Sequence, residues 1–137
     1  MNNEDAKPEA GAPMKVGDRM PDGTIYAGTS PDTGTAMYTT SADAPLTYTF
    51  NQAQTYAEKR AAHGRPDWRV PTRGELNVLF ENRTAIGGFS ISGLHPAGWY
   101  WSSSQYSDYG AWDQRFSDGH QDGNYKGNTA SLRCVRG

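Results

Sequence analysis

The sequence has little cysteine, no long apolar run and no excess of basic charge, and each shortage excludes a class of protein. The single cysteine, Cys134, cannot form a disulfide within the chain, so the fold is held without covalent cross-links. No stretch approaches the roughly 18 consecutive apolar residues of a membrane-spanning helix, so we expect no membrane insertion. The net charge is −2 and there is no basic stripe, which argues against a nucleic-acid partner.

Motifs for metals, cofactors and export are absent as well. The three histidines, His63, His95 and His120, lie far apart in the sequence and lack the spacing of zinc ligands, so we expect neither a metal nor a cofactor. The polar stretch that begins at Met1 contains no apolar core of a signal peptide, so we predict no secretory signal.

The composition instead combines many aromatic residues with many glycines. Of 137 residues, 35% are hydrophobic, and the chain carries four Trp, eight Tyr, four Phe and sixteen Gly. Leu, Ile and Val are too sparse for the repeated apolar stripes of a helical bundle. The aromatic content argues against a disordered or collagen-like chain. We therefore expect one small, loop-rich domain whose core rests on large aromatic side chains.

The chain divides into a short leader and one domain. Residues 1–13 are acidic and aperiodic, which predicts a flexible leader, and residues 14–137 form the domain. Residues 24–28 and 36–39 are predicted strands, and the turn signals between them indicate a hairpin.

Two helices with capping boxes are expected in the middle of the chain. Thr49 has Gln52 three residues later, and the helix that it begins should end near Gly64. Thr72 stands in the same relation to Glu75, and its helix should extend to about residue 82.

The last third lacks helical periodicity and contains strand patterns. Residues 98–103, 111–116 and 130–135 are predicted strands. The order of hairpin, helices, long loops and strands predicts an α+β fold in which two helices pack on an antiparallel β-sheet.

Three sequence blocks carry a resemblance to a known family. They are residues 68–76 (WRVPTRGEL), 99–104 (WYWSSS) and 132–136 (LRCVR). In this order they resemble the domain that ends bacterial collagen-like adhesins. The resemblance covers roughly residues 14–137 and implies a C-type lectin fold of the formylglycine-generating-enzyme type.

A restricted residue alphabet distinguishes residues 105–130. Twelve positions there hold only Asn, Asp, Ser, Gly, Tyr or His, which are among the residues that an AAY asparagine codon can yield when its adenines are replaced. They are Ser107, Asp108, Tyr109, Gly110, Asp113, His120, Asp122, Gly123, Asn124, Tyr125, Gly127 and Asn128. Residues between them, such as Trp112 and Phe116, have the character of scaffold. The arrangement resembles the variable region of diversity-generating retroelement proteins.

That resemblance implies a module for ligand binding and receptor recognition, displayed on a phage virion or a bacterial cell surface. Its partner would be a protein or glycan on a target cell, and the module could act as an oligomer. Tyr supplies rigid contact area and the small polar residues supply adaptable hydrogen bonds, as in antibody loops. Trp101 and Tyr106 are further candidates for an aromatic binding platform, although core packing explains each equally well.

Two alternatives stay open at this point. The same residues are common in ordinary loops, so the domain could be a non-diversified adhesin that binds acidic polysaccharide. Its positive surface would come from Arg115, Lys126, Arg133 and Arg136. An enzyme is disfavoured, because neither paired carboxylates nor a nucleophile with its partners can be recognised.

Overall fold

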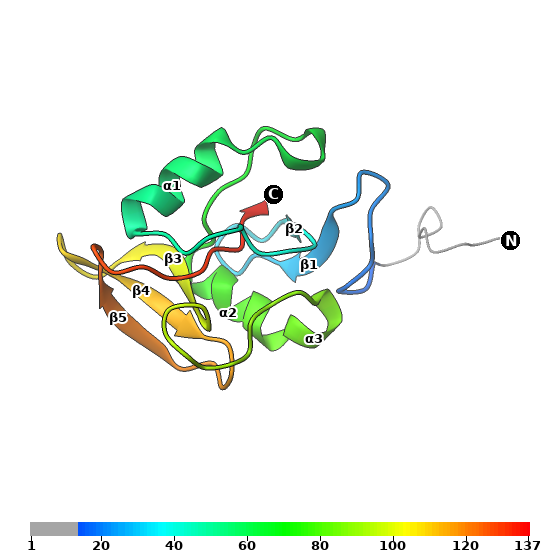
Figure 1. The fold of residues 1–137 in the computed structure, drawn as a ribbon. Coiled ribbons are helices and arrows are strands. Elements are labelled where there is room, and N and C mark those ends of the chain that lie inside the picture. The colour runs from blue at the N-terminus through cyan, green and yellow to red at the C-terminus, as the bar shows by residue number, and fades with distance from the viewer. Residues whose placement is uncertain (1–13) are drawn as a thin grey trace, which may run out of the picture.

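The computed structural model describes residues 14–137, and the leader predicted for residues 1–13 lies outside them. Two antiparallel three-stranded sheets and two capped helices give the α+β architecture that the sequence predicts (Figure 1). The first sheet has the order β1-β2-β6 and the second the order β3-β4-β5. The strands are β1 (Ile25–Thr29), β2 (Ala36–Thr39), β3 (Trp99–Gln105), β4 (Gly110–Arg115), β5 (Gln121–Tyr125) and β6 (Val135–Arg136).

Local hydrogen bonds at both predicted caps explain where the helices begin. Helix α1 (Phe50–Lys59) starts after Thr49, and α2 (Arg73–Glu81) starts after Thr72, each with a complete capping box. Helix α1 ends at Lys59, earlier than predicted, and a separate 3-10 turn (Ala62–Gly64) follows it. A short helix, α3 (Arg83–Ile86), continues beyond α2.

Two strand predictions in the last third need correction. The terminal strand is much shorter than residues 130–135, because Ala130 and Ser131 make only isolated bridges, to Tyr48 and to Tyr100. Strand β5 was not predicted at all. Its residues favour turns, yet all five of them pair with β4.

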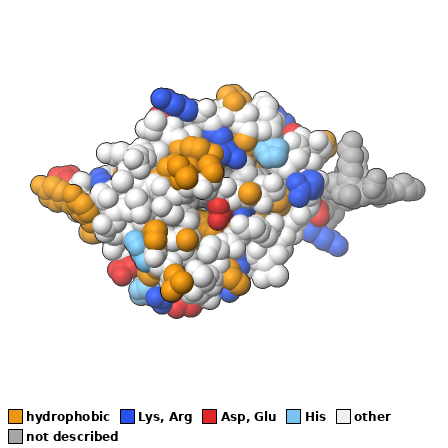
Figure 2. Space-filling view, in the orientation of Figure 1, with side chains coloured by type: hydrophobic (Ala, Val, Ile, Leu, Met, Phe, Trp, Pro, Cys, Tyr) orange, Lys and Arg blue, Asp and Glu red, His pale blue; other side chains and the backbone are white. Residues whose placement is uncertain are grey.

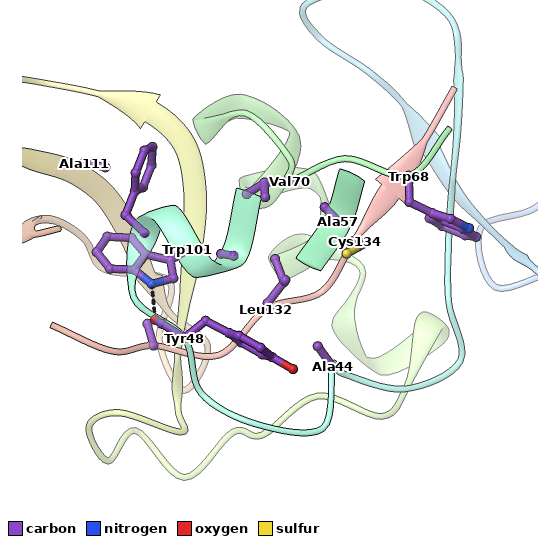
Figure 3. Close-up of a cluster of buried hydrophobic side chains, with 12 residues drawn as sticks. Ala44, Tyr48, Ala57, Trp68, Val70, Trp101, Ala111, Leu132 and Cys134 are labelled. Carbon is purple, nitrogen blue, oxygen red and sulfur yellow. Dashed lines mark hydrogen bonds between the residues drawn. The ribbon is translucent and has the colours of Figure 1, made fainter. Parts of the chain in front are cut away.

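The aromatic side chains fill two cores. In the first core the Trp101 indole lies edge-on to Phe50, with ring centroids 5.7 Å apart. Its Nε1 donates a 2.7 Å hydrogen bond to the carbonyl of Tyr48 (Figure 3). In the second core Tyr100 and Phe116 pack with Leu76 and Leu79 of α2. Trp101 is fully buried, so its ring belongs to the core and is not part of an exposed platform.

An ion pair between a buried carboxylate and a partly exposed arginine fastens α2 to the rest of the molecule. The Glu75 carboxylate is fully buried and accepts hydrogen bonds of 2.6 and 2.8 Å from the Arg69 guanidinium. It also accepts a 2.6 Å bond from the hydroxyl of Ser30, which directly follows β1. These contacts hold the pKa of Glu75 at about 2 despite its burial, because each favours the charged form.

In the part of the chain described here, no helix has both the length and the apolar character needed to cross a bilayer.

Candidate functional site

The β3-β4-β5 sheet has one face that packs on α2 and one that is only partly covered. On the α2 side, the Gln114 amide donates a 2.8 Å hydrogen bond to Asn77. Side chains of neighbouring residues alternate between the two faces. Asp113 and Asp122, which pair directly across β4 and β5, therefore lie on the opposite face. Trp101 shares this face, where Phe50 of α1 covers it.

The uncovered part of this face contains a small hollow, which we call the strand pocket. It has a volume of about 130 Å³. Its lining residues are His95, Trp99, Asp113, Asp122, Gly123 and Asn124. The lining thus combines two carboxylates and an amide with the aromatic rings of His95 and Trp99.

Asp113 is an unusual member of this pocket because it is only 2% exposed. Its Oδ2 accepts a 2.8 Å hydrogen bond from the Asn124 amide. Within residues 14–137, no other side chain donates to it and no Lys or Arg forms an ion pair with it. Burial raises the pKa of Asp113 to about 7; the Asn124 hydrogen bond opposes the rise, and the facing charge of Asp122 adds to it.

A second hollow, the tip groove, lies at the β3–β4 turn. It has a volume of about 340 Å³. Its lining residues are Thr49, Asn51, Asp108, Tyr109, Tyr125, Lys126 and Gly127. Tyr109 is 75% exposed and Tyr125 is 60% exposed, so both rings are available to a ligand. Hydrophobic side chains gather at this end of the molecule in Figure 2.

Hydrogen bonds order the turn that carries the tip groove. The Ser107 hydroxyl accepts 3.1 Å bonds from the backbone N–H groups of Tyr109 and Gly110. Lys126 donates from its backbone to the Tyr109 carbonyl at 2.8 Å, and its ammonium group donates to the carbonyl of Asp108 at 3.0 Å. The two tyrosines are therefore presented from a fixed backbone, which reduces the ordering that binding would require.

Most of the twelve predicted variable positions fall in or beside the two hollows. Asp113, Asp122, Gly123 and Asn124 line the strand pocket, and Asp108, Tyr109, Tyr125 and Gly127 line the tip groove. His120 is exposed beside the pocket, 3.9 Å from the Asp122 carboxylate. Asn128 donates a 2.9 Å bond to Asn124.

Two of the twelve predicted variable positions are buried, although the sequence suggested that all twelve are exposed to solvent. Gly110 and Asp113 are both buried, so the small stability cost expected for replacing a surface residue does not extend to them. A Cβ atom at Gly123 would lie 2.5 Å from the ring of Tyr106, and Gly110 also lies against that ring. Larger residues at either glycine require Tyr106 to move.

Tyr106 and Trp112 belong to the α2 face and not to the strand pocket. Their rings meet at 5.7 Å, and the Arg73 guanidinium stacks 3.7 Å from the centre of the Trp112 ring. Tyr106 remains half exposed, so part of its ring is accessible on the α2 face of the hairpin.

Sequence reasoning missed four lining residues. His95 and Trp99 line the strand pocket and Thr49 and Asn51 line the tip groove, but of these four only Thr49 was given a structural role, as a helix cap. The ladders that join β3 to β4 and β4 to β5, together with the approach of α1 to the hairpin, create these contacts, and no local sequence signal marks them.

The four basic residues considered for acidic polysaccharide all have partners within the molecule. Arg115 pairs with Asp118 at 2.6 Å, and Arg136 pairs with Asp67 at 2.9 Å. Lys126 is held at the hairpin turn. Arg133, which was expected to contribute to a positive surface, is fully buried.

The burial of Arg133 has a clear structural cause. Its guanidinium forms a 2.9 Å ion pair with Asp43 and donates to the carbonyls of Thr40 and Gly87. The ring of Phe89 lies 3.9 Å from it. Arg133 therefore ties the last segment of the chain to two loops and cannot supply a positive surface.

Among residues 14–137, no three His, Cys, Asp or Glu side chains are grouped so that they could hold a metal ion. The serines of residues 102–104 serve the backbone instead: the Ser102 hydroxyl donates a 2.7 Å bond to the Trp112 carbonyl, and the Ser104 hydroxyl accepts from the backbone of Arg73.

The fold and the two hollows define a small α+β domain that presents aromatic and polar side chains from the β3-β4-β5 sheet and its β3–β4 turn. The chain belongs to the family of Lcl C-terminal domains, whose family model matches residues 28–136. No curated protein matches the chain.

Proposed function

We propose that this domain is a ligand-binding module with a C-type lectin fold, whose residues 105–130 display a diversified surface for receptor recognition. Its target is a protein or glycan on a cell surface, and it acts by binding and not as an enzyme. Membership of the Lcl C-terminal domain family fits an adhesin-like or variable-protein-like module.

One observation carries the proposal: eight of the twelve restricted-alphabet residues line two hollows on the β3-β4-β5 sheet and its β3–β4 turn. Ordinary loop composition gives no reason for such residues to collect there. The scaffold residues between them, including Gln114 and Phe116, lie in the interior. A surface that varies while its scaffold stays constant needs this separation, because variable residues that carried the core would unfold the domain.

The decisive test is to sequence the gene in many cells of a single lineage. The proposal expects changes at adenines in the codons of the twelve positions, with the codons of residues 14–104 unchanged. Changes spread evenly along the chain would refute diversification and leave a fixed adhesin.

A binding experiment tests recognition separately. Two natural sequence variants that differ only within residues 105–130 should bind different cells in a flow-cytometry assay with the labelled domain. Identical binding by such variants would contradict the assignment of recognition to this surface. The double variant Tyr109→Ala, Tyr125→Ala should lose binding, whereas the exposed control Glu58→Gln on α1 should retain it.

A further inference from the structure

Within residues 14–137, no Lys or Arg forms an ion pair with the two carboxylates of the strand pocket. Asp113 and Asp122 are directly opposite each other on neighbouring antiparallel strands, an arrangement that is unfavourable for like charges. Buried carboxylates are normally paired with a cation, because an isolated buried charge is costly. Asp113 is buried, lines a surface pocket and has only the neutral Asn124 amide as a side-chain partner in the described chain.

A positively charged ligand group would supply the missing partner. Such a group would lie between the carboxylates of Asp113 and Asp122 and offset the repulsion between them, and the fold would not have to change. The aromatic ring of Trp99 lines the same pocket and suits the apolar stem of a long cationic side chain. The Arg115 guanidinium lies 5.2 Å from the Trp99 ring but is committed to Asp118.

We propose that the strand pocket binds a lysine or arginine side chain of a protein partner, an inference that rests on the proposed function. A hollow of about 130 Å³ has room for one side chain and not for an extended oligosaccharide. The neighbouring tip groove exposes Tyr109 and Tyr125, the rigid aromatic contacts that protein-binding loops favour. The strand pocket would thus bind the charged side chain, and the tip groove would supply a larger aromatic contact surface beside it.

The test uses the full 137-residue chain labelled with nitrogen-15 and observed by NMR. The probes are Nα-acetyl-lysine methylamide, the corresponding arginine compound, the Nε-acetylated lysine compound and glucosamine. The lysine and arginine probes should cause saturable shifts at the backbone amides of residue 113 and residues 122–124. The Nε-acetylated probe, which lacks the charge, should cause none. Equal shifts from charged and acetylated lysine would overturn the proposal, and tighter binding of glucosamine would overturn the choice of a protein side chain.

Variants locate the charge that is responsible. Asp113→Asn should weaken binding of the lysine probe at least about tenfold, since it removes a buried charge partner. Asp122→Asn removes an exposed charge but keeps the Oδ1 atom that accepts a 2.8 Å hydrogen bond from the Gly123 backbone N–H, and it should also weaken binding. Glu58→Gln, an exposed carboxylate on α1, should leave affinity unchanged. If Asp122→Asn binds the lysine probe with full affinity, and a folded Asp113→Asn does so as well, the assignment is refuted.

The pH dependence adds a readout that a merely structural Asp113 would not produce. With a pKa of about 7, Asp113 is about one-tenth ionised at pH 6 and about nine-tenths at pH 8, so affinity should rise about tenfold. Lysine stays charged throughout this range. The other titratable groups near the site are Asp122, His95 in the pocket and His120 beside Asp122. Any pH dependence of affinity that remains in Asp113→Asn comes from groups other than Asp113. If the affinity of Asp113→Asn changes with pH as much as that of wild type, a role for Asp113 is contradicted.

The outcomes separate this inference from the proposed function. Adenine-directed changes in clonal sequences, combined with no binding of either cationic probe, leave the proposed function intact and overturn the inference. Binding of the cationic probes without such changes supports the pocket and refutes diversification.

Discussion

Replacing the buried carboxylate of Glu75 by an amide should destabilise the domain in a way that depends on pH. In Glu75→Gln the side chain keeps its shape but loses the charge that receives two bonds from Arg69 and one from Ser30. The new amide group also presents a donor where the carboxylate accepted. We expect a loss of about 3 kcal/mol at pH 7, at the lower end for broken buried ion pairs, because the Arg69 left without its partner is partly exposed.

The shift in the pKa of Glu75 gives an independent magnitude. The pKa falls from 4.5 to about 2 on folding, which corresponds to about 3 kcal/mol of stability. Because the folded pKa is depressed, this stability is complete above pH 4.5. It is lost as the pH falls towards 2, where the folded carboxyl also becomes protonated. The difference in the free energy of unfolding between wild type and Glu75→Gln should therefore shrink from about 3 kcal/mol at pH 7 to a small remaining value near pH 2.

Urea unfolding followed by tryptophan fluorescence at pH 7, 5, 4, 3 and 2 measures this difference. Asp67→Asn is the matched control, because its carboxylate pairs with Arg136 at an exposed position and should contribute less than about 1 kcal/mol. A cost of Glu75→Gln that stays constant from pH 7 to pH 2 would show that the charge of Glu75 does not stabilise the fold.

Three further predictions concern the core, the surface and the alternative function. Arg133→Met should lower the free energy of unfolding by about 3–5 kcal/mol, because it leaves the partly buried Asp43 without its cation. Thermal melts measure this loss, and an unchanged melting midpoint would contradict the role given to Arg133. Tyr109→Ala should leave that free energy within about 0.5 kcal/mol of wild type in chemical denaturation, and a larger loss would mean that the ring supports the turn. The domain should pass through a heparin column at low ionic strength, since its candidate cations are already paired; retention there would favour binding of acidic polysaccharide.

The local elements could be predicted because their signals lie within a few residues. The capping boxes at Thr49 and Thr72 place both helix starts, since each cap joins groups three residues apart. The strand pattern at residues 36–39 matches β2 for a similar reason. The restricted alphabet of residues 105–130 is likewise a property of the sequence alone, and it marked most residues of both hollows before any contact was known.

Tertiary structure decided the remaining features, because they depend on partners far along the chain. Strand β5 forms from turn-favouring residues only because β4 offers a complete ladder of partners. Arg133 is buried because Asp43, 90 residues earlier, meets its guanidinium. Asp113 appeared to be one variable surface residue among twelve. The pairing of β4 with β5 sets it opposite Asp122, and the close packing around it makes it a buried carboxylate with a raised pKa. Composition and spacing thus marked most of the residues of the candidate site, while burial and charge pairing in three dimensions determined which of them carry its chemistry.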